Sequence, residues 1–248
     1  MASTRKTILL TGASSGIGRA TAQLLLQRGY RVIGLARDFS KFPCTDRNFT
    51  GIPVDLAGLD ALPSFLERLI GEYGPFDGAI CNAGRGRFAS LEEFSYVQIR
   101  ELLELNLTSQ IFLARALLPG MKRRKSGTLI FMGSETALQG AKNGTVYAAA
   151  KFGLRGLVQS LRAECSASGV RVSIINPGMV KTEFFDWLDF QPGMEPDNHI
   201  LPDDVAEAVL LVLEARPGTV IDEINLSPQK KVVRTAGATQ QKKQGLNK

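Results

Sequence analysis

The chain has 248 residues, of which 44% are hydrophobic and 22% are charged, with 25 Gly and 11 Pro. These proportions indicate an ordinary globular protein and exclude collagen-like, disordered and disulfide-scaffold chains. The formal net charge of +6 arises in residues 229–248, which hold six Lys and Arg and no acid. The charge therefore indicates a basic tail, and it disfavours a nucleic-acid-binding groove.

Three scattered cysteines and one histidine exclude a thiolate zinc site and a two-histidine metal site. An odd number of cysteines without a Cys-x-x-Cys pair also favours a reducing compartment. No apolar run approaches the roughly 18 residues needed to cross a bilayer, and the short polar start has no signal-peptide pattern. We therefore expect a cytoplasmic protein that does not associate with a membrane.

Apolar, β-branched runs alternate with segments of helical period along the chain. Strands are predicted at Thr7–Thr11, Arg31–Ala36, Phe49–Val54, Gly78–Cys81, Thr128–Met132, Val170–Asn176 and Thr219–Leu226. Helices are predicted near Gly16–Arg28, Leu59–Tyr73, Ser95–Met121, Val146–Ser166 and Pro202–Ala215. This alternation predicts an α/β fold: a single doubly wound Rossmann-type domain over residues 1–228, with a seven-stranded parallel sheet flanked by helices. In such sheets the ligand binds beyond the C-terminal ends of the strands.

A glycine-rich turn follows the first predicted strand. Glycines let the backbone turn tightly and approach a ligand, while free N–H groups at the start of the next helix face an anion. The alternative is a tight turn that binds nothing. The spacing Gly-x-x-x-Gly-x-Gly gives these candidate cofactor-binding residues: Gly12, Ser14, Ser15, Gly16, Ile17 and Gly18.

The end of the second predicted strand indicates which dinucleotide binds. An acid at this place would bond the ribose hydroxyls of NAD, but the chain has Ala36 there, followed by Arg37. An Arg fork matches a 2′-phosphate, so NADP(H) is favoured. Asp38 keeps NAD as the alternative. Asp55, after the third strand, is a candidate to bond the adenine amino group, a role compatible with a helix N-cap.

With these features the chain resembles the short-chain dehydrogenases/reductases, from roughly Lys6 to Leu226. The resemblance rests on Thr11–Gly18, Asn82-Ala83-Gly84, Asn106, Ser134, Tyr147-x-x-x-Lys151 and Pro177-Gly178. It implies that Asn106 holds a water against Lys151 in a proton relay. It also implies that the sheet is braced beside the cofactor by Asn82, Ala83 and Gly84, and that the nicotinamide is covered by Pro177, Gly178, Val180 and Thr182. Cys81 stands where the family often has Asn.

Tyr147 and Lys151 lie four residues apart on a predicted helix, so their side chains share one face. A tyrosine titrates near pH 10. We expect the Lys151 ammonium and an oxidised nicotinamide to lower the Tyr147 pKa by about two to three units, into a working range for acid–base catalysis. Ser134, at the end of a strand, would hold the substrate oxygen beside the phenol.

The sequence therefore predicts an NADP(H)-dependent oxidoreductase that transfers hydride between nicotinamide and a carbonyl or alcohol substrate, without a metal. Tyr147 would be the general acid/base, and Ser134 and Tyr147 would touch the substrate. Two alternatives remain on the same scaffold: a reductase of 3-oxoacyl thioesters or sterol-like substrates, and a non-catalytic cofactor-sensing protein.

Residues 183–201 form a long segment rich in Phe, with the only Trp of the chain, and are predicted to be a substrate lid. Its aromatic residues favour an apolar small-molecule substrate, although they could equally pack the lid onto the body. The basic tail, residues 229–248, is expected to be disordered, with at most a weak contact to an anionic surface. A dimer or tetramer is expected, with its geometry left open.

Overall fold

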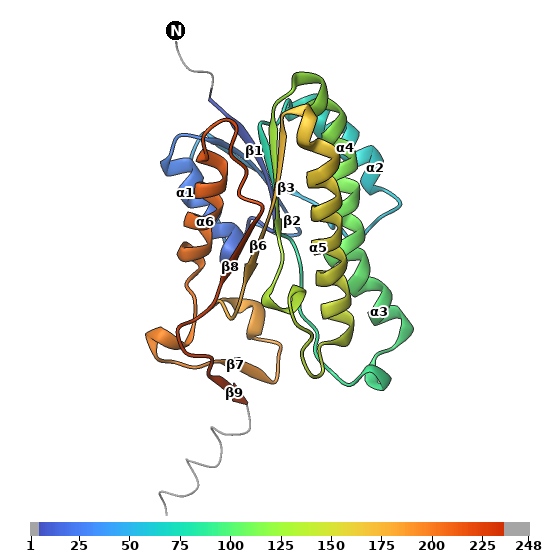
Figure 1. The fold of residues 1–248 in the computed structure, drawn as a ribbon, viewed down its shortest axis with the longest axis vertical. Coiled ribbons are helices and arrows are strands. Elements are labelled where there is room, and N and C mark those ends of the chain that lie inside the picture. Colours follow the sequence, from blue (N-terminus) through green and yellow to red (C-terminus); the bar gives the residue numbers. More distant parts are fainter. Residues whose placement is uncertain (1–4, 236–248) are drawn as a thin grey trace, which may run out of the picture.

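The computed structural model describes residues 5–235. Figure 1 shows helices on both sides of one central sheet. The sheet has seven parallel strands in the order β3-β2-β1-β4-β5-β6-β8, which confirms the predicted Rossmann-type α/β fold. The strands span Thr7–Thr11 (β1), Arg31–Ala36 (β2), Phe49–Pro53 (β3), Gly78–Cys81 (β4), Gly127–Met132 (β5), Val170–Pro177 (β6) and Glu223–Leu226 (β8).

The central strands are continuous apolar runs because both faces of the sheet are covered. Every residue of β1, β4 and β5 is buried, as expected for a parallel sheet between two helical layers. Strand order reverses at β1, where Leu9 pairs with Ile33 of β2 on one side and with Ala79 of β4 on the other. This reversal is the topological switch point, beside which such sheets bind ligands.

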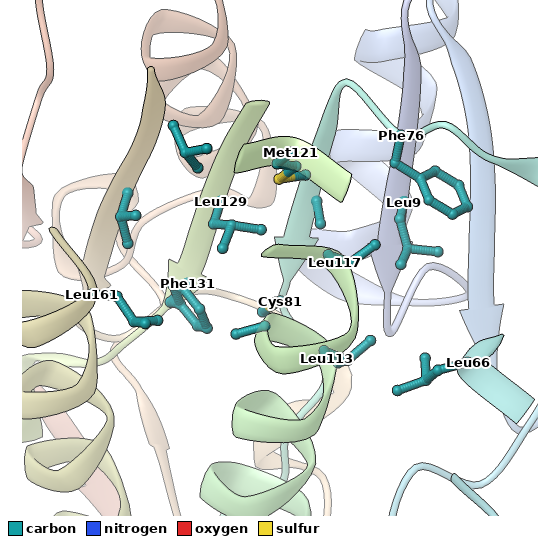
Figure 2. Packing of buried hydrophobic residues seen from close by; sticks show 14 of the residues in the cluster. Leu9, Leu66, Phe76, Cys81, Leu113, Leu117, Met121, Leu129, Phe131 and Leu161 are labelled. Atoms are coloured by element: carbon teal, nitrogen blue, oxygen red, sulfur yellow. The ribbon is translucent and has the colours of Figure 1, made fainter. Parts of the chain in front are cut away.

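Two helical layers bury the faces of the sheet, with α1 and α6 on one face and α2, α4 and α5 on the other (Figure 1). In the second layer, Leu113, Leu117 and Met121 of α4 belong to the same core cluster as Leu129 and Phe131 of β5 (Figure 2). Burial of these apolar side chains fixes the helices against the sheet. The helices span Gly16–Gln27 (α1), Leu62–Tyr73 (α2), Ser109–Arg124 (α4), Thr145–Cys165 (α5) and Pro202–Glu214 (α6).

The helix predicted over residues 95–121 is in fact two helices. α3 (Tyr96–Leu103) and α4 are joined by a π-helical turn over Glu104–Thr108. Asn106 is buried in this turn, and its side-chain amide donates to the carbonyl oxygens of Arg85 and Leu102 at 3.0 and 2.9 Å. Asn is unfavourable inside a regular helix, and here the bond to Arg85, in another segment, stabilises the side chain of Asn106 in the π-helical turn.

The last strand of the sheet is shorter than predicted. Only Glu223–Leu226 forms β8, because only these residues pair with the end of β6, between Ile174 and Pro177. The other predicted strands and helices are present with ends shifted by a few residues at most.

The lid and the start of the tail are ordered together, which corrects the expectation of disorder from residue 229 onward. β7 (Phe190–Pro192) pairs antiparallel with β9 (Val233–Thr235). In Figure 1 this small sheet lies beyond the ends of β6 and β8. The lid also contains 3₁₀ turns at Glu183–Phe185 and Pro196–Asn198, so it is not structureless. Residues 236–248 of the predicted tail lie outside the described residues.

Candidate active site

The C-terminal ends of β1, β4, β5 and β6 open into a cleft of about 1360 Å³. Asp55 and Gly18 do not line it, whereas the other predicted site residues do: Gly12, Ser14, Ser15, Gly16, Ile17, Arg37, Asn82, Ala83, Gly84, Asn106, Ser134, Tyr147, Lys151, Pro177, Gly178, Val180 and Thr182. The fold thus gathers side chains from distant segments at the switch point between β1 and β4.

The glycine-rich turn has a backbone that only glycine fits. Gly12 and Gly16 have φ of +67° and +48°, in the left-handed region that other residues rarely adopt. Gly18 lies beneath the turn, where a Cβ would overlap the carbonyl oxygen of Gly12. Ser15, the N-cap of α1, forms no side-chain cap. The first N–H groups of α1 are therefore left to bond an anion in the cleft, and the turn fits the phosphates of a dinucleotide.

We predict that Gly18→Ala displaces this turn, lowers stability by roughly 1–3 kcal/mol through overpacking and weakens dinucleotide binding. Gly71→Ala is the matched control, because a Cβ there meets nothing within 4 Å on helix α2. The control variant should gain about 0.5–1 kcal/mol from better helix propensity. Urea unfolding and a cofactor titration measure both effects, and a Gly18→Ala protein with unchanged stability and binding would contradict this packing.

The Asn82-Ala83-Gly84 turn is tied to neighbouring segments on two sides. The backbone N–H groups of Asn82 and Ala83 both donate to the Thr11 hydroxyl at 2.9 Å. From α4, the buried Gln110 side chain donates to the carbonyl oxygen of Ala83 at 2.9 Å. Gln110 was not predicted, since a single glutamine in an amphipathic helix carries no local signal. These bonds fix the turn between β1 and α4, and the role beside the cofactor that the resemblance implies for its three residues stays a prediction.

Asn106 holds the chain just beyond this turn. Its side-chain oxygen accepts from the Arg85 N–H at 3.2 Å, while its amide is bonded as described above. Both ends of the Asn106 side-chain amide therefore form hydrogen bonds with backbone groups. The relay role implied for Asn106 remains a prediction.

Arg37 and Asp38 both line the cleft at the end of β2. Both carboxylate oxygens of Asp38 are engaged by Ser40, at 2.8 Å from its N–H and 2.5 Å from its hydroxyl. These hydrogen bonds lower the pKa of Asp38. Asp55 is exposed and accepts from the N–H of Ala57 at 3.0 Å, outside the cleft. The contact with the adenine amino group predicted for Asp55 stays a prediction.

Ser134, Tyr147 and Lys151 meet at the end of β5. Ser134 follows the strand after Gly133, and its hydroxyl oxygen accepts from the N–H of Thr136 at 3.2 Å, so its proton stays available to a ligand. Tyr147 and Lys151 are buried on α5 and share one face. The Lys151 ammonium lies 5.6 Å from the centre of the Tyr147 ring and donates to the carbonyl oxygen of Met132 at 2.8 Å.

The pKa of Tyr147 shifts in the direction opposite to that predicted. Burial raises it to about 12, and the nearby Ser134 hydroxyl, as a hydrogen-bond partner, only partly opposes this rise. Burial also lowers the pKa of Lys151 to about 8. Desolvation disfavours the charged form of each group and is the largest cause of both shifts. Tyr147 therefore holds its proton at neutral pH, which suits a proton donor.

An aromatic wall encloses Tyr147 on the substrate side. Phe88 lies 5.2 Å and Phe184 6.2 Å from the Tyr147 ring, centre to centre. Phe190 of β7 contacts Phe88 at 5.0 Å and Phe185 at 5.8 Å. Lid aromatics thus line the cleft as predicted and also pack on one another. Phe88 was not predicted, although its place shortly after the Asn-Ala-Gly turn could have indicated it.

The sequence of the chain matches the family of short chain dehydrogenases over residues 6–189. The chain belongs to this family. It is 34% identical over 182 residues to the 3-oxoacyl-[acyl-carrier-protein] reductase FabG of Vibrio cholerae, covering 72% of this chain and 75% of that protein. It is 31% identical over 214 residues to human retinol dehydrogenase 8, covering 79% and 68%.

Among solved structures, a metagenomic short-chain oxidoreductase in complex with NADP is 30% identical, with a TM-score of 0.77 and coverage of 91% of this chain and 98% of that one. This short-chain dehydrogenase is accordingly an oxidoreductase, as the sequence predicted. Within residues 5–235, no helix is both long and apolar enough to cross a bilayer. The same residues contain no group of three or more His, Cys, Asp and Glu side chains placed to hold a metal.

Proposed function

We propose that this short-chain dehydrogenase reduces the carbonyl group of an apolar small molecule with NADPH. The observation that carries the proposal is the buried Tyr147 phenol, protonated at neutral pH beside the Ser134 hydroxyl. When bound, the nicotinamide supplies the hydride. Tyr147 holds the proton that its phenol oxygen gives to the substrate oxygen, and the Ser134 hydroxyl donates a hydrogen bond that orients that oxygen. Lys151 keeps its ammonium beneath this pair through the Met132 carbonyl.

Arg37 supports the choice of NADPH. Arg37 is exposed at the end of β2 and lines the cleft, where its guanidinium is free to bond a 2′-phosphate, while the neighbouring Asp38 carboxylate is engaged by Ser40. An Arg fork binds phosphate through charge-assisted hydrogen bonds. The NADP-bound metagenomic relative supports the same preference.

The aromatic wall supports an apolar substrate. Phe88, Phe184 and Phe190 surround the approach to Tyr147, and aromatic surfaces bind apolar groups in closed sites. The two enzyme relatives differ in the substrates that their names give, an acyl thioester and a retinol. Both classes carry long apolar chains, and both belong in the test.

The test is NADPH oxidation against a panel of ketones, aldehydes, quinones and 3-oxoacyl thioesters. We expect turnover of at least one apolar carbonyl compound, faster with NADPH than with NADH. Ser134→Ala should lower the rate by about 10²-fold, since it removes one donor to the developing oxyanion. A protein that binds NADPH but turns over no member of the panel would instead support the cofactor-sensing alternative.

The pKa of Lys151, about 8, predicts a pH dependence. The ammonium is present below this pH and is lost above it, so the rate of carbonyl reduction should fall as pH rises through about 8. Tyr147, whose pKa is about 12, keeps its proton over the same range and does not cause the fall. A pH profile of kcat measures it. In Lys151→Arg the charge persists, so the fall should vanish, and a wild-type profile that stays flat from about pH 6 to about pH 10 would contradict the assignment.

We further propose a cytoplasmic homo-oligomer. The free thiols of Cys44, Cys81 and Cys165 support a reducing compartment. A shallow apolar groove of about 290 Å³ between α4 and α5, with Ile111 partly exposed, supports self-association through these helices. Light scattering of the purified protein gives the subunit number.

A further inference from the structure

Residues 229–235, here called the strap, cross the lid after leaving the parallel sheet. Strap and lid form an antiparallel pair in which Phe190 lies opposite Thr235 and Pro192 opposite Val233. The N–H of Gly193 donates to the carbonyl oxygen of Val232 at 2.9 Å and extends the pairing. The strap therefore holds the lid through the backbone, whatever its side chains are.

Two adjacent lysines of the strap contact different parts of the site. Lys230 binds the lid, with its ammonium 2.6 Å from the Asp197 carboxylate and its N–H donating to the Asp197 carbonyl oxygen at 2.8 Å. Lys231 binds the body, with its ammonium 2.8 Å from the carboxylate of Glu135, the residue that follows Ser134. The strap thus joins the lid to the segment that carries the catalytic serine.

One face of the β7–β9 pair is turned toward the cleft. Phe190 lies opposite Thr235, and Val233 is two residues from Thr235 on the same strand. Directly opposite residues share a face, and so do residues two apart on one strand, so Phe190 and Val233 lie on the same side of the pair. Both line the cleft. Phe190 packs on Phe88, which packs on Tyr147, so the cleft-facing side of the pair continues a row of aromatic side chains that leads to the catalytic phenol. Val233 lines the mouth of the cleft on this side, where it is 57% exposed.

We propose that the strap completes the substrate pocket: Val233 limits the size of the substrate, and the Lys231–Glu135 pair positions the lid over Ser134. Val233 is thus a specificity-determining residue, and Lys231 a positioning residue. This inference rests on the proposed function for the nature of the substrate. The position of the strap rests on the contacts above alone.

The size limit is tested with NADPH and three aryl ketones of increasing chain length: acetophenone, propiophenone and butyrophenone. Val233→Phe narrows the outer end of the pocket and should lower kcat/KM for butyrophenone relative to acetophenone by roughly tenfold. This is the discrimination that one or two methylene groups produce in an apolar pocket. Val233→Ala should shift the ratio the other way. Val232→Phe is the matched control, because Val232 does not line the cleft and neighbouring strand residues face opposite sides. Equal ratios in Val233→Phe and Val232→Phe would overturn the proposal.

The coupling to Glu135 is tested without substrate or cofactor. Trp187 is the only tryptophan of the chain and lies in the lid, so its fluorescence anisotropy reports how firmly the lid is held. Lys231→Glu and Glu135→Lys should each lower the anisotropy, by an amount that corresponds to a roughly two- to fivefold shift toward a released lid, typical of an exposed ion pair. The exchanged pair, with both substitutions, should restore it, and high salt should remove the differences.

Failure of the exchanged pair to restore the anisotropy would overturn the positioning role of Lys231. If the wild-type protein reduces none of the ketones while the anisotropy behaves as expected, the proposed function fails for these ketones, and the size limit at Val233 fails with it, while the positioning role of Lys231 stands. If the ketones are reduced but the Val233 ratios do not move, the strap proposal fails and the function stands.

Discussion

Tyr147→Phe should abolish carbonyl reduction, with kcat/KM lower by about 10³-fold, because the variant lacks the proton that the phenol gives to the substrate oxygen. The ring itself stays. It keeps its packing against Phe88 and Phe184, at 5.2 and 6.2 Å, so the shape of the pocket is retained. NADPH binding should change little. Steady-state kinetics and a fluorescence titration with NADPH separate the two effects.

Tyr96→Phe is the matched control for this experiment. Tyr96 begins α3, is 93% exposed and does not line the cleft, so its hydroxyl should be dispensable. A Tyr147→Phe enzyme that retained a near-normal rate would show that another group donates the proton. A variant that lost NADPH binding together with activity would show that the hydroxyl serves the cofactor and not the substrate.

Arg37→Glu should invert the cofactor preference. The substitution removes charge-assisted hydrogen bonds to a 2′-phosphate and places a carboxylate against it, so KM for NADPH should rise roughly 100-fold, on the scale of 1.5–3 kcal/mol for a bond to a charged group. KM for NADH, which lacks that phosphate, should change by less than about threefold. Initial rates with both cofactors at one substrate concentration measure the ratio.

Arg47→Glu is the matched control: it makes the same change of charge at a residue that does not contact the 2′-phosphate. Arg47 is exposed on the segment before β3 and does not line the cleft. If the two variants altered NADPH binding equally, the effect would be long-range electrostatics and not recognition at Arg37. A wild-type preference for NADH would make Asp38 the deciding residue, in spite of its bonds to Ser40.

Much of the site could be predicted because parallel strands bring their ends to one edge. The glycine turn, Ser134 and the Tyr147–Lys151 pair each follow a recognisable strand or lie on the next helix. Each motif is weak alone, and their combination, with the resemblance to the short-chain dehydrogenases/reductases, singled them out. The seven-stranded sheet followed from the alternation of apolar runs with helical segments.

The features that the sequence did not indicate depend on contacts between distant segments. Val233 reaches the cleft only because β9 pairs with β7, and nothing in the local sequence of a basic tail predicts that pairing. The pKa of Tyr147 depends on how much water burial removes, whereas sequence spacing reports only the neighbouring charge of Lys151. Gln110 reaches the Asn82-Ala83-Gly84 turn through its bond to the Ala83 carbonyl oxygen, in another segment.

The π-helical turn between α3 and α4 changes the phase of everything after it. In an unbroken helix, Leu102 and Leu113 would lie on nearly the same side, at about 100° per residue. Here Leu102 packs in the cluster that contains Tyr147, while Leu113 packs in the core beneath the sheet. If Glu104–Thr108 wound as a regular α-helix without a change in its length, one of these leucines would turn out of its cluster. The wide winding of this short stretch therefore lets one continuous segment pack against both the floor of the active site and the hydrophobic interior.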